Sequence, residues 1–414
     1  KPGMRVFKSK LLLKTKSDGT KSIRAVVQAF KRMFAQGVDY DEKYAGTARW
    51  STVLILLVLA VFYDYKISLI DIKTFFLYGD LDEKEQIFME RIEGQDLPEG
   101  YINKVVGSLY GHPAAAYRAK KKLNHCLTHD GLFKQASNDS CLYILQHETE
   151  KFMFGVHVDD LPGCGTPGGL AITLQRLRET FEITVQEEPS VILGVQLERN
   201  WKTKQLKLHQ GDYVRKMLAE YGMAECKSCR TPLEGSILGK IKQLLADGKL
   251  VGPLGREEEH RKFQGSLIWL YKTRPDVFFA TGLLSRFNEC AGDEQINWHK
   301  QILRYLAADP EKGLILAPGD KLFLHASSDS DWGGDAISLK STSGGLISLG
   351  VRAYIVFYSV LQRKLADSSQ MAETYAAHQL VRAVLEVRGK LAEMGVNVPL
   401  PISLLQDNRG VVKM

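Results

Sequence analysis

The chain has 414 residues, 44% of them hydrophobic and 25% charged, and its formal net charge is +7. This composition is typical of a folded protein with real cores, and it excludes a disordered chain, a collagen-like fibre and a small disulfide scaffold. The longest apolar run, 53–63, is too short for the roughly 20 residues of a membrane span, and the first residues lack a signal-peptide core. Six cysteines favour a reducing compartment. We therefore expect an intracellular protein that is neither secreted nor membrane-bound.

The positive charge is concentrated at the start of the chain. Residues 1–50 hold twelve Lys and Arg against four Asp and Glu, so the remainder is close to neutral. A basic segment on a neutral body favours a polyanionic partner such as nucleic acid. A solvated, lysine-rich surface explains the same charge, and composition alone does not separate the two.

Hydrophobic periodicity divides the chain into three blocks. The first block, 1–225, mixes strands and helices, the second, 226–312, is mostly helical, and the third, 315–414, has the order strand, strand, strand, helix, strand. The sequence therefore predicts a multi-domain α+β protein. The elements expected in the first block are a strand pair over 6–14 and 23–30, an apolar helix over 52–64, a buried strand over 67–71, a helix with a basic face over 117–128 and a strand over 152–158.

Carboxylates end two apolar strands of the first block. Asp71 closes one strand, and the adjacent Asp159 and Asp160 follow another. A charge at such a place is costly unless it is paired or bound to metal, and neighbouring carboxylates repel unless a cation lies between them. Two Mg²⁺ ions held in this way can activate a 3′-hydroxyl and neutralise a triphosphate during in-line attack. Each aspartate taken alone also fits a simple turn cap.

Short motifs around these carboxylates recur in a fixed order along nearly the whole chain. They are 24–30, 37–40, 48–52, 71–81, 108–113, 158–160, 193–195, 231–233, 265–267, 273–276, 304–306, 328–332, 341–344, 372–373 and 407–408. In wording and order they resemble the reverse transcriptase and ribonuclease H region of Ty1/copia-type retrotransposon polyproteins. No single motif is decisive, but chance does not reproduce so many in sequence.

The resemblance implies a right-hand polymerase followed by a ribonuclease H-like α/β domain. Fingers and palm would occupy 1–225, a thumb or connection 226–312, and the ribonuclease H-like domain 315–414. In the family, residues at the positions of Asp71 and Asp159 hold two catalytic Mg²⁺ ions, and one at the position of Asp160 assists near the primer end. The segment 193–194 falls where the family grips the primer.

The resemblance also implies substrate contacts. Arg24 would contact the incoming deoxynucleoside triphosphate, and Phe76 would be the aromatic gate that excludes a 2′-hydroxyl. Template phosphates would lie against the basic helix face made of Arg118, Lys120, Lys121 and Lys122.

Four positions depart from the family pattern. His157 stands where the family usually has Tyr, Phe75 where it has a small residue, Ala114 where it has a polar one, and Ala119 where it has an aromatic one. A bulky Phe75 beside the nucleotide pocket would crowd the substrate. These changes suggest a divergent or decaying copy in which all three carboxylates are kept.

The third block carries its own acidic residues. In the predicted helix 371–394, Glu373 lies in line with an apolar stripe, so it needs a partner, and a metal shared with Asp329 and Asp407 would provide one. Stabilisation of the helix N-terminus is the alternative role for Glu373. Ribonuclease H sites of this kind use a fourth carboxylate further on, so we expect the domain to be truncated at Met414.

The sequence thus predicts an RNA-directed DNA polymerase with an associated ribonuclease H-like domain. Its partners would be an RNA template, a DNA primer or RNA–DNA hybrid, and deoxynucleoside triphosphates, with Mg²⁺ as cofactor, in the cytoplasm, a virus-like particle or the nucleus. The alternative is an inactive relic or a host-adopted nucleic-acid-binding protein. Primer extension on an RNA template separates the two, and the oligomeric state is left open.

Overall fold

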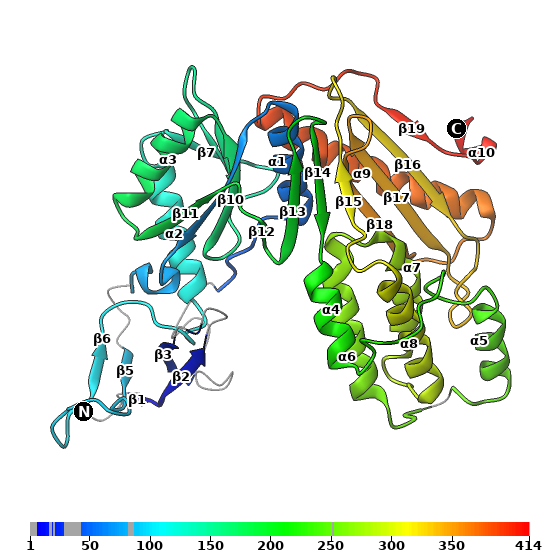
Figure 1. Ribbon diagram of the computed structural model, residues 1–414, viewed down its shortest axis with the longest axis horizontal. Coiled ribbons are helices and arrows are strands. Elements are labelled where there is room, and N and C mark those ends of the chain that lie inside the picture. Colours follow the sequence, from blue (N-terminus) through cyan, green and yellow to red (C-terminus); the bar gives the residue numbers. More distant parts are fainter. Residues whose placement is uncertain are drawn as a thin grey trace. The chain divides into compact units, whose positions relative to one another are not determined.

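A computed structural model of the chain describes residues 6–15, 19, 21–28, 43–81, 87–250 and 252–413. The chain forms two compact units, one of residues 1–49 and 66–188 and the other of residues 50–65 and 189–414. Figure 1 labels most of the helices and strands of both units. The mixed α/β class with several sheets, expected from the sequence, is confirmed. Motif 37–40 and the end of motif 24–30 lie outside the described residues.

The first unit is built on a six-stranded antiparallel sheet (Figure 1). Its strands, in spatial order, are β11 (Ile183–Glu187), β4 (Lys66–Ile72), β10 (Asp160–Gly165), β9 (Phe152–Gly155), β8 (Leu142–Leu145) and β7 (Phe133–Gln135). Asp71, the second-last residue of β4, and Asp160, the first residue of β10, therefore lie on directly neighbouring strands inside the sheet.

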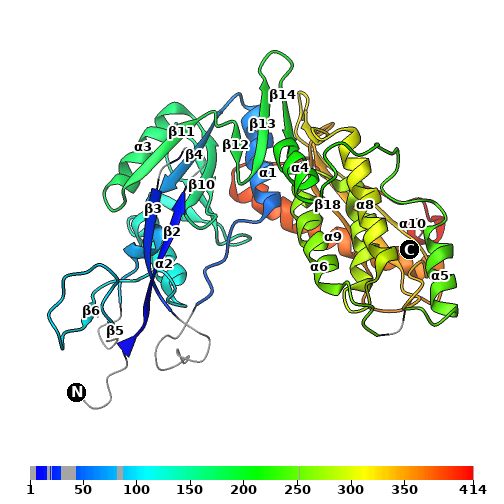
Figure 2. The same cartoon turned by 60° about the horizontal axis from the view of Figure 1, so that its bottom comes forward.

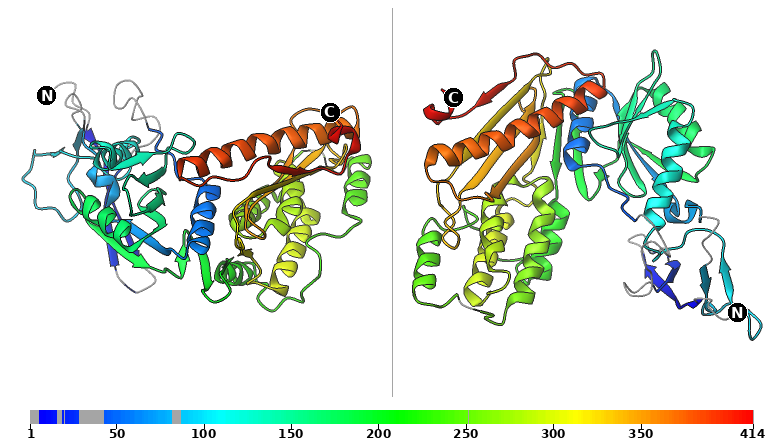
Figure 3. Two further views of the ribbon diagram at one scale, coloured as in Figure 1. Left: turned by 90° about the horizontal axis from the view of Figure 1, so that it is seen from above. Right: turned by 180° about the vertical axis from the view of Figure 1, so that it is seen from behind.

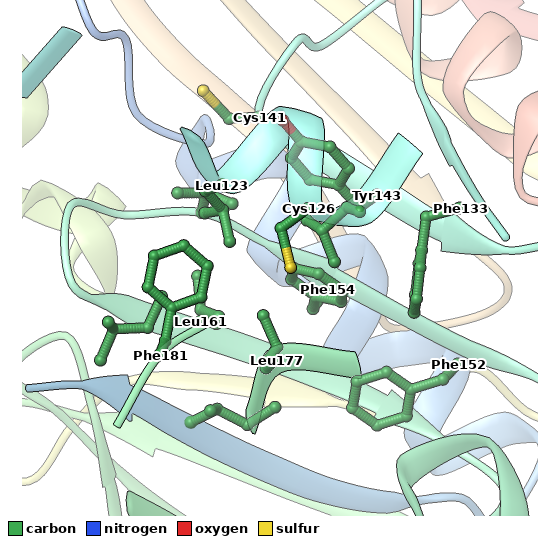
Figure 4. Packing of buried hydrophobic residues seen from close by; sticks show 14 of the residues in the cluster. Leu123, Cys126, Phe133, Cys141, Tyr143, Phe152, Phe154, Leu161, Leu177 and Phe181 are labelled. Carbon is green, nitrogen blue, oxygen red and sulfur yellow. The ribbon is translucent and has the colours of Figure 1, made fainter. Parts of the chain in front are cut away.

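Two helices contact each other and this sheet, namely α2 (Ala115–Thr128) and α3 (Pro167–Arg178). Thr166 begins α3 as its N-cap, because its hydroxyl accepts a hydrogen bond from the Gly169 amide at 3.2 Å and a proline follows at the first helical position. The helices and strands enclose an aromatic-rich core, part of which is drawn in Figure 4.

Two smaller sheets complete the first unit. A three-stranded sheet joins β1 (Val6–Phe7), β5 (Ile87–Met89) and β6 (Asn103–Val105). The predicted strand pair near the start of the chain is confirmed as the antiparallel hairpin of β2 (Ser9–Thr15) and β3 (Lys21–Val27), seen in Figure 2. A short 3₁₀ turn, η1 (Phe75–Tyr78), follows β4.

The second unit contains two four-stranded sheets. One consists of β12 (Val191–Ile192), β13 (Val195–Asn200), β14 (Gln205–His209) and β15 (Leu314–Leu316). The other has the order β18 (Tyr354–Leu361), β17 (Thr342–Leu349), β16 (Leu324–Ser330) and β19 (Ser403–Leu405), with β16 parallel to β19. The long helix α9 (Ser369–Glu393) runs across this second sheet and contacts β16 and β17 (Figure 3).

A helical region with its own apolar core lies between β14 and β15 in the sequence. It contains α4 (Gly211–Glu220), α5 (Ile237–Ala246), α6 (Glu257–Ile268), η2 (Trp269–Lys272), η3 (Pro275–Val277), α7 (Phe278–Leu284), η4 (Ser285–Phe287) and α8 (Asp293–Ala308), and α10 (Arg409–Val412) ends the chain. The mostly helical second block and the strand–helix order of the third block are both as the sequence predicted.

The apolar helix α1 (Trp50–Phe62) belongs to the second unit although its neighbours in sequence build the first. Ten consecutive residues, 52–61, are buried, as expected for a helix that is apolar on all sides. The helix contacts β14, β15 and β18. Among the described residues, no helix combines the length and the apolar character that crossing a membrane requires.

Candidate active site

Strand pairing brings together the aspartates of the first unit. Asp71 on β4 lies directly opposite Asp160 on β10, and the Ile72 amide donates to the Asp159 carbonyl at 3.0 Å. Residues directly opposite on antiparallel strands direct their side chains to the same face of the sheet. We call Asp71, Asp159 and Asp160 the first carboxylate group.

A tight turn presents Asp159 at the edge of the sheet. His157 and Asp160 exchange backbone hydrogen bonds of 2.8 and 3.1 Å across a two-residue loop formed by Val158 and Asp159. Val158 has a φ of +62°, a left-handed conformation that is strained for a β-branched residue. Such strain is commonly found where a turn serves a site, because the surrounding structure must enforce it.

The electrostatics show that the three carboxylates influence one another. Burial raises the pKa of Asp160 to about 6, with further contributions from the negative charges of Asp159 and Asp71. Clustered carboxylates of this kind favour binding of a divalent cation, because a cation removes their mutual repulsion. Thr184 on β11 also lies close, with its hydroxyl 3.5 Å from an Asp71 carboxylate oxygen.

Tyr110 lies beside the β2–β3 hairpin and contacts two residues that were predicted to bind the nucleotide, Arg24 and Phe76. The Arg24 guanidinium lies 5.2 Å from the centre of the Tyr110 ring, and the Phe76 ring meets the same ring edge to face at 5.7 Å. Burial raises the pKa of Tyr110, Arg24 lowers it, and Asp159 raises it. The sequence analysis gave Tyr110 no role, although it quoted the motif 108–113 that contains it.

Tyr110 is fixed by its backbone. The Val27 amide donates to the Tyr110 carbonyl at 2.9 Å, and the next residue, Gly111, has a φ of +90°. A Cβ at Gly111 would lie 2.2 Å from the Val27 carbonyl oxygen, so only glycine fits this approach. The Tyr110–Gly111 segment is thereby held against the end of β3.

A cavity of about 260 Å³ lies beside these residues. It is lined by Phe75, Phe76, Lys120 and Val158, together with residues 44–47, Ala116 and Val156. An aromatic wall and a lysine suit a group that combines a planar ring with negative charge.

The predicted basic face of α2 is only partly present. Arg118 is buried, with 7% of its surface exposed, and one of its guanidinium nitrogens lies 3.4 Å from Nδ1 of His112. The expectation that Arg118 lies on an exposed basic face is therefore wrong, because its side chain packs inward. Lys120 donates to Cys141 Sγ at 3.0 Å, Lys122 pairs with Asp80 at 2.9 Å, and Lys121 is exposed.

Three of the four departures from the family pattern have structural counterparts. Phe75 is 3% exposed and packs in the core near Phe181, with ring centroids 6.5 Å apart, so much of its ring serves packing. Ala114 is buried, and its amide donates to Nδ1 of His112 at 3.1 Å. His157 stands at the base of the turn that presents Asp159.

The second unit contains another acidic cluster, which we call the second carboxylate group. Ligand oxygens of Asp329, Glu373 and Asp407 all lie within 4.8 Å of one another. Because β16 and β19 are parallel, their carboxyl ends meet at one edge of the sheet, and Asp329 and Asp407 lie there. The structure thus brings together the three residues that the sequence singled out in this block.

Glu373 comes from the first turns of α9 and is 6% exposed. Its carboxylate accepts hydrogen bonds from the Ser330 amide and from Nε2 of Gln406, both at 3.1 Å. Burial raises the pKa of Glu373, and nearby Asp329 adds to the rise against these two donors. Gln406 is a contact that the sequence analysis missed, since nothing in its local pattern separates it from a solvent-exposed residue.

The composition of the second carboxylate group fits a hard divalent cation such as Mg²⁺, which prefers oxygen ligands. Over the described part of the chain, no Lys or Arg pairs with Glu373, Asp329 or Asp407. Two other nearby acids are engaged elsewhere. Asp331 accepts from the Thr342 amide, and the buried Asp335 pairs with Arg286 at 3.3 Å.

The reverse transcriptase (RNA-dependent DNA polymerase) family matches residues 2–235, which is more than half of the chain. The chain therefore belongs to the reverse transcriptase family.

Curated relatives place it among transposon polyproteins. It is 32% identical over 378 residues to the retrovirus-related Pol polyprotein from transposon RE1 of Arabidopsis thaliana, covering 90% of this chain and 25% of that protein. For the Pol polyprotein from transposon TNT 1-94 of Nicotiana tabacum the identity is 29% over 405 residues, covering 95% and 30%. A putative transposon Ty5-1 protein of Saccharomyces cerevisiae is 24% identical over 322 residues, covering 76% and 100%.

The recognition of a Ty1/copia-type retrotransposon polyprotein from the sequence is confirmed by these matches. The chain spans between 25% and 30% of the length of the two plant polyproteins.

Proposed function

We propose that the chain carries the RNA-directed DNA polymerase of a copia-type retrotransposon, which adds deoxynucleotides to a primer 3′-hydroxyl on an RNA template. The observation that carries this proposal is the pairing of Asp71 with Asp160 across β4 and β10, with Asp159 in the adjoining turn. The pairing occurs in a chain of the reverse transcriptase family.

The residues of the first unit divide the work of nucleotidyl transfer. Asp71 and Asp159 would hold two Mg²⁺ ions, which supply activation of the 3′-hydroxyl and neutralisation of the triphosphate. Asp160 adds negative charge beside them and strengthens the hold on cations. Arg24, set against Tyr110, would bind the triphosphate oxygens, and Phe76 would crowd a 2′-hydroxyl in the adjoining cavity.

We assign the fingers and palm to 1–225, the thumb or connection to 226–312 and a ribonuclease H-like domain to 315–414. The second carboxylate group supports the last assignment, because three converging carboxylates suit cleavage of the RNA strand in a hybrid by metal-activated water. In this site Glu373 is positioned by Ser330 and Gln406, and the exposed Asp329 and Asp407 would contact the substrate.

Primer extension on an RNA template with Mg²⁺ tests the polymerase. Asp159→Asn should abolish extension and leave binding of the template–primer nearly intact, because the lost group holds metal while lysines and arginines hold phosphates. Glu187→Gln, an exposed carboxylate on β11 of the same sheet, is the matched control. Equal extension by Asp159→Asn and the control would show that Asp159 is not a metal ligand.

A nucleic-acid-binding protein without turnover is the second candidate, and the basic first segment favours it. Both candidates predict an affinity for template–primer that falls steeply with salt and depends little on sequence. Lys121→Ala is expected to reduce the salt dependence, since this lysine is exposed on α2. Salt-dependent binding without extension would favour the second candidate, and an affinity that stays flat with salt would contradict both.

A further inference from the structure

The hairpin between β12 and β13 turns through two residues in an unusual conformation. Ile192 pairs with Val195, so Leu193 and Gly194 form a two-residue loop, with φ values of +49° and +77°. Loops with both residues in the left-handed region favour Asn followed by Gly, because leucine there brings its Cβ against the backbone. Leu193 is therefore strained, and other parts of the structure must hold it in place.

Two residues of η2 supply that support. The Lys272 ammonium donates to the Leu193 carbonyl at 2.6 Å. A Cβ added to Gly194 would lie 3.2 Å from the Trp269 ring, so the ring packs closely against the loop. Both contacts come from a segment more than seventy residues further along the chain.

Lys272 sits in a setting that is unusual for a lysine. Its ammonium lies 3.7 Å from the centre of the Trp269 ring and 5.6 Å from that of Trp50. Within the described ranges it has no acidic partner, and burial lowers the pKa of Lys272 to about 8. Cation–π contacts and one carbonyl compensate in part for the lost hydration.

The lysine is itself fixed by its surroundings. Trp50 Nε1 donates to the Lys272 carbonyl at 2.8 Å, and Gln210 Nε2 donates to the Trp269 carbonyl at 3.1 Å. The hydroxyl of Thr273, the next residue, donates to Gln210 Oε1 at 2.9 Å. These hydrogen bonds fix the backbone of Trp269 and Lys272 beside the strained loop, and Gly194 and Trp269 are exposed at its surface.

We propose that Lys272 and Trp269 are positioning residues that hold the loop 193–194 in the conformation that contacts the primer strand. The inference rests on the proposed polymerase function, in which a primer strand is held for extension. Lys272 acts through the Leu193 carbonyl and not on the reacting atoms. Its loss relaxes the loop and loosens the grip on the primer, while the chemistry at the first carboxylate group continues.

The test compares Lys272→Met with Lys262→Met, using full-length chain. Lys262 is a matched control, since its ammonium also lies over an aromatic ring, 5.6 Å from the centre of the Tyr221 ring, but it pairs with Glu220 instead of the loop. Hydrogen exchange of the amides at 193–195 reports on the loop, and extension kinetics report KM for template–primer and kcat separately.

Lys272→Met should speed exchange at 193–195 and raise KM for template–primer about tenfold, the loss expected for one charge-assisted hydrogen bond, with kcat changed less than twofold. Lys272→Arg should restore most of the affinity, since arginine keeps the charge and a donor. Lys262→Met should change neither quantity. Trp269→Phe is a milder change that keeps an apolar ring, and it should speed exchange at 193–195 and raise KM for template–primer by smaller amounts. This variant replaces Lys272→Met in the test if Lys272→Met does not fold.

Unchanged exchange and KM in Lys272→Met, or equal effects in Lys262→Met, would overturn the proposal. A fall in kcat with KM unchanged would also overturn it, because the residue would then act on the chemical step. If wild type binds template–primer but does not extend it, the polymerase function fails, and a tenfold weaker affinity of Lys272→Met still supports the positioning role. Absence of both binding and extension in wild type would contradict both proposals.

Discussion

In the first carboxylate group the backbone itself sets the acidic residues side by side, through a strand ladder and a two-residue turn. In the second, three separate segments contribute one carboxylate each, from the end of β16, the start of α9 and the residues after β19. The first group depends on the register of two strands, and the second on the docking of a helix against a sheet. The difference shows that acidic sites are assembled here either by strand pairing or by the docking of a helix against a sheet.

The two carboxylate groups also differ in what shifts the pKa of their members. Asp160 has its pKa raised by burial and then by two neighbouring carboxylates. Glu373 has its pKa raised mainly by burial, and two N–H donors counter this. Over the part of the chain that the structure describes, the second group is the one set of three or more acidic, His or Cys residues whose ligand atoms converge. The second group is therefore the more fully preorganised for a cation.

The largest expected effect is a separation of two activities. Asp71→Asn should reduce primer extension by about a thousandfold and leave cleavage of an RNA–DNA hybrid unchanged, and Glu373→Gln should do the reverse, since a lost metal ligand costs roughly this much in rate. The measurement is a paired extension and cleavage assay on one hybrid substrate. Loss of both activities in either variant would mean that the two groups are not independent sites.

The core behind the first group gives the next largest effect. Phe75→Ala should lower the free energy of unfolding by about 3–5 kcal/mol, because the ring is 3% exposed and packs near Phe181. The adjacent Phe76 is half-buried, so Phe76→Ala should cost about 1 kcal/mol and instead increase incorporation of ribonucleotides. Urea unfolding and a ribonucleotide incorporation assay measure the two. Faster extension by Phe75→Ala at unchanged stability would show that the ring obstructs the substrate.

Cations should stabilise the second unit through the second group. At a Mn²⁺ concentration of a hundred times the dissociation constant, binding to the folded state adds about 2.7 kcal/mol to the free energy of unfolding. Asp407→Asn should remove this gain, because it takes away one of three converging ligands. Thermal unfolding with and without Mn²⁺ measures it, with Asp320→Asn as the control. An equal gain in Asp407→Asn would place the cation elsewhere.

The smallest effect concerns Asp276, a carboxylate whose pKa is lowered where those of Asp160 and Glu373 are raised. Burial raises the pKa of Asp276, but hydrogen bonds from Arg274 and Tyr305 and the charges of Arg274 and Lys312 outweigh it and hold the pKa at about 2. Because this pKa is below its unfolded value near 3.8, the stabilisation is present above pH 4 and is lost as the pH falls toward 2.

Replacing Asp276 by a neutral residue tests this pH dependence of the free energy of unfolding. Asp276→Asn should cost about 2 kcal/mol at pH 7 and almost nothing near pH 2, which flattens the acid side of the stability curve. Chemical unfolding over this pH range measures it. An unchanged curve would mean that Asp276 is equally well stabilised in the unfolded chain. Asp276 is stabilised by the charged side chains of Arg274 and Lys312, whereas Asp160 is destabilised by neighbouring carboxylates.

Local pattern was enough to predict several parts of this protein. Apolar runs and alternation predicted the hairpin β2–β3, the buried helix α1 and the element order of the third block, because secondary structure follows short-range periodicity. The stripe on α9 likewise predicted that Glu373 faces inward, where the structure places it. Carboxylates at strand ends were visible as Asp71 and Asp159 before any pairing was known.

Only the tertiary structure decided which segments meet. Pairing of β4 with β10 set Asp71 opposite Asp160, and the packing of α2 turned Arg118 inward although its local sequence is basic. The same holds for α1, which joins the second unit, and for Lys272, which supports a loop far away in sequence. Such contacts depend on the total burial and hydrogen bonding of distant segments, and no short window of sequence contains that information.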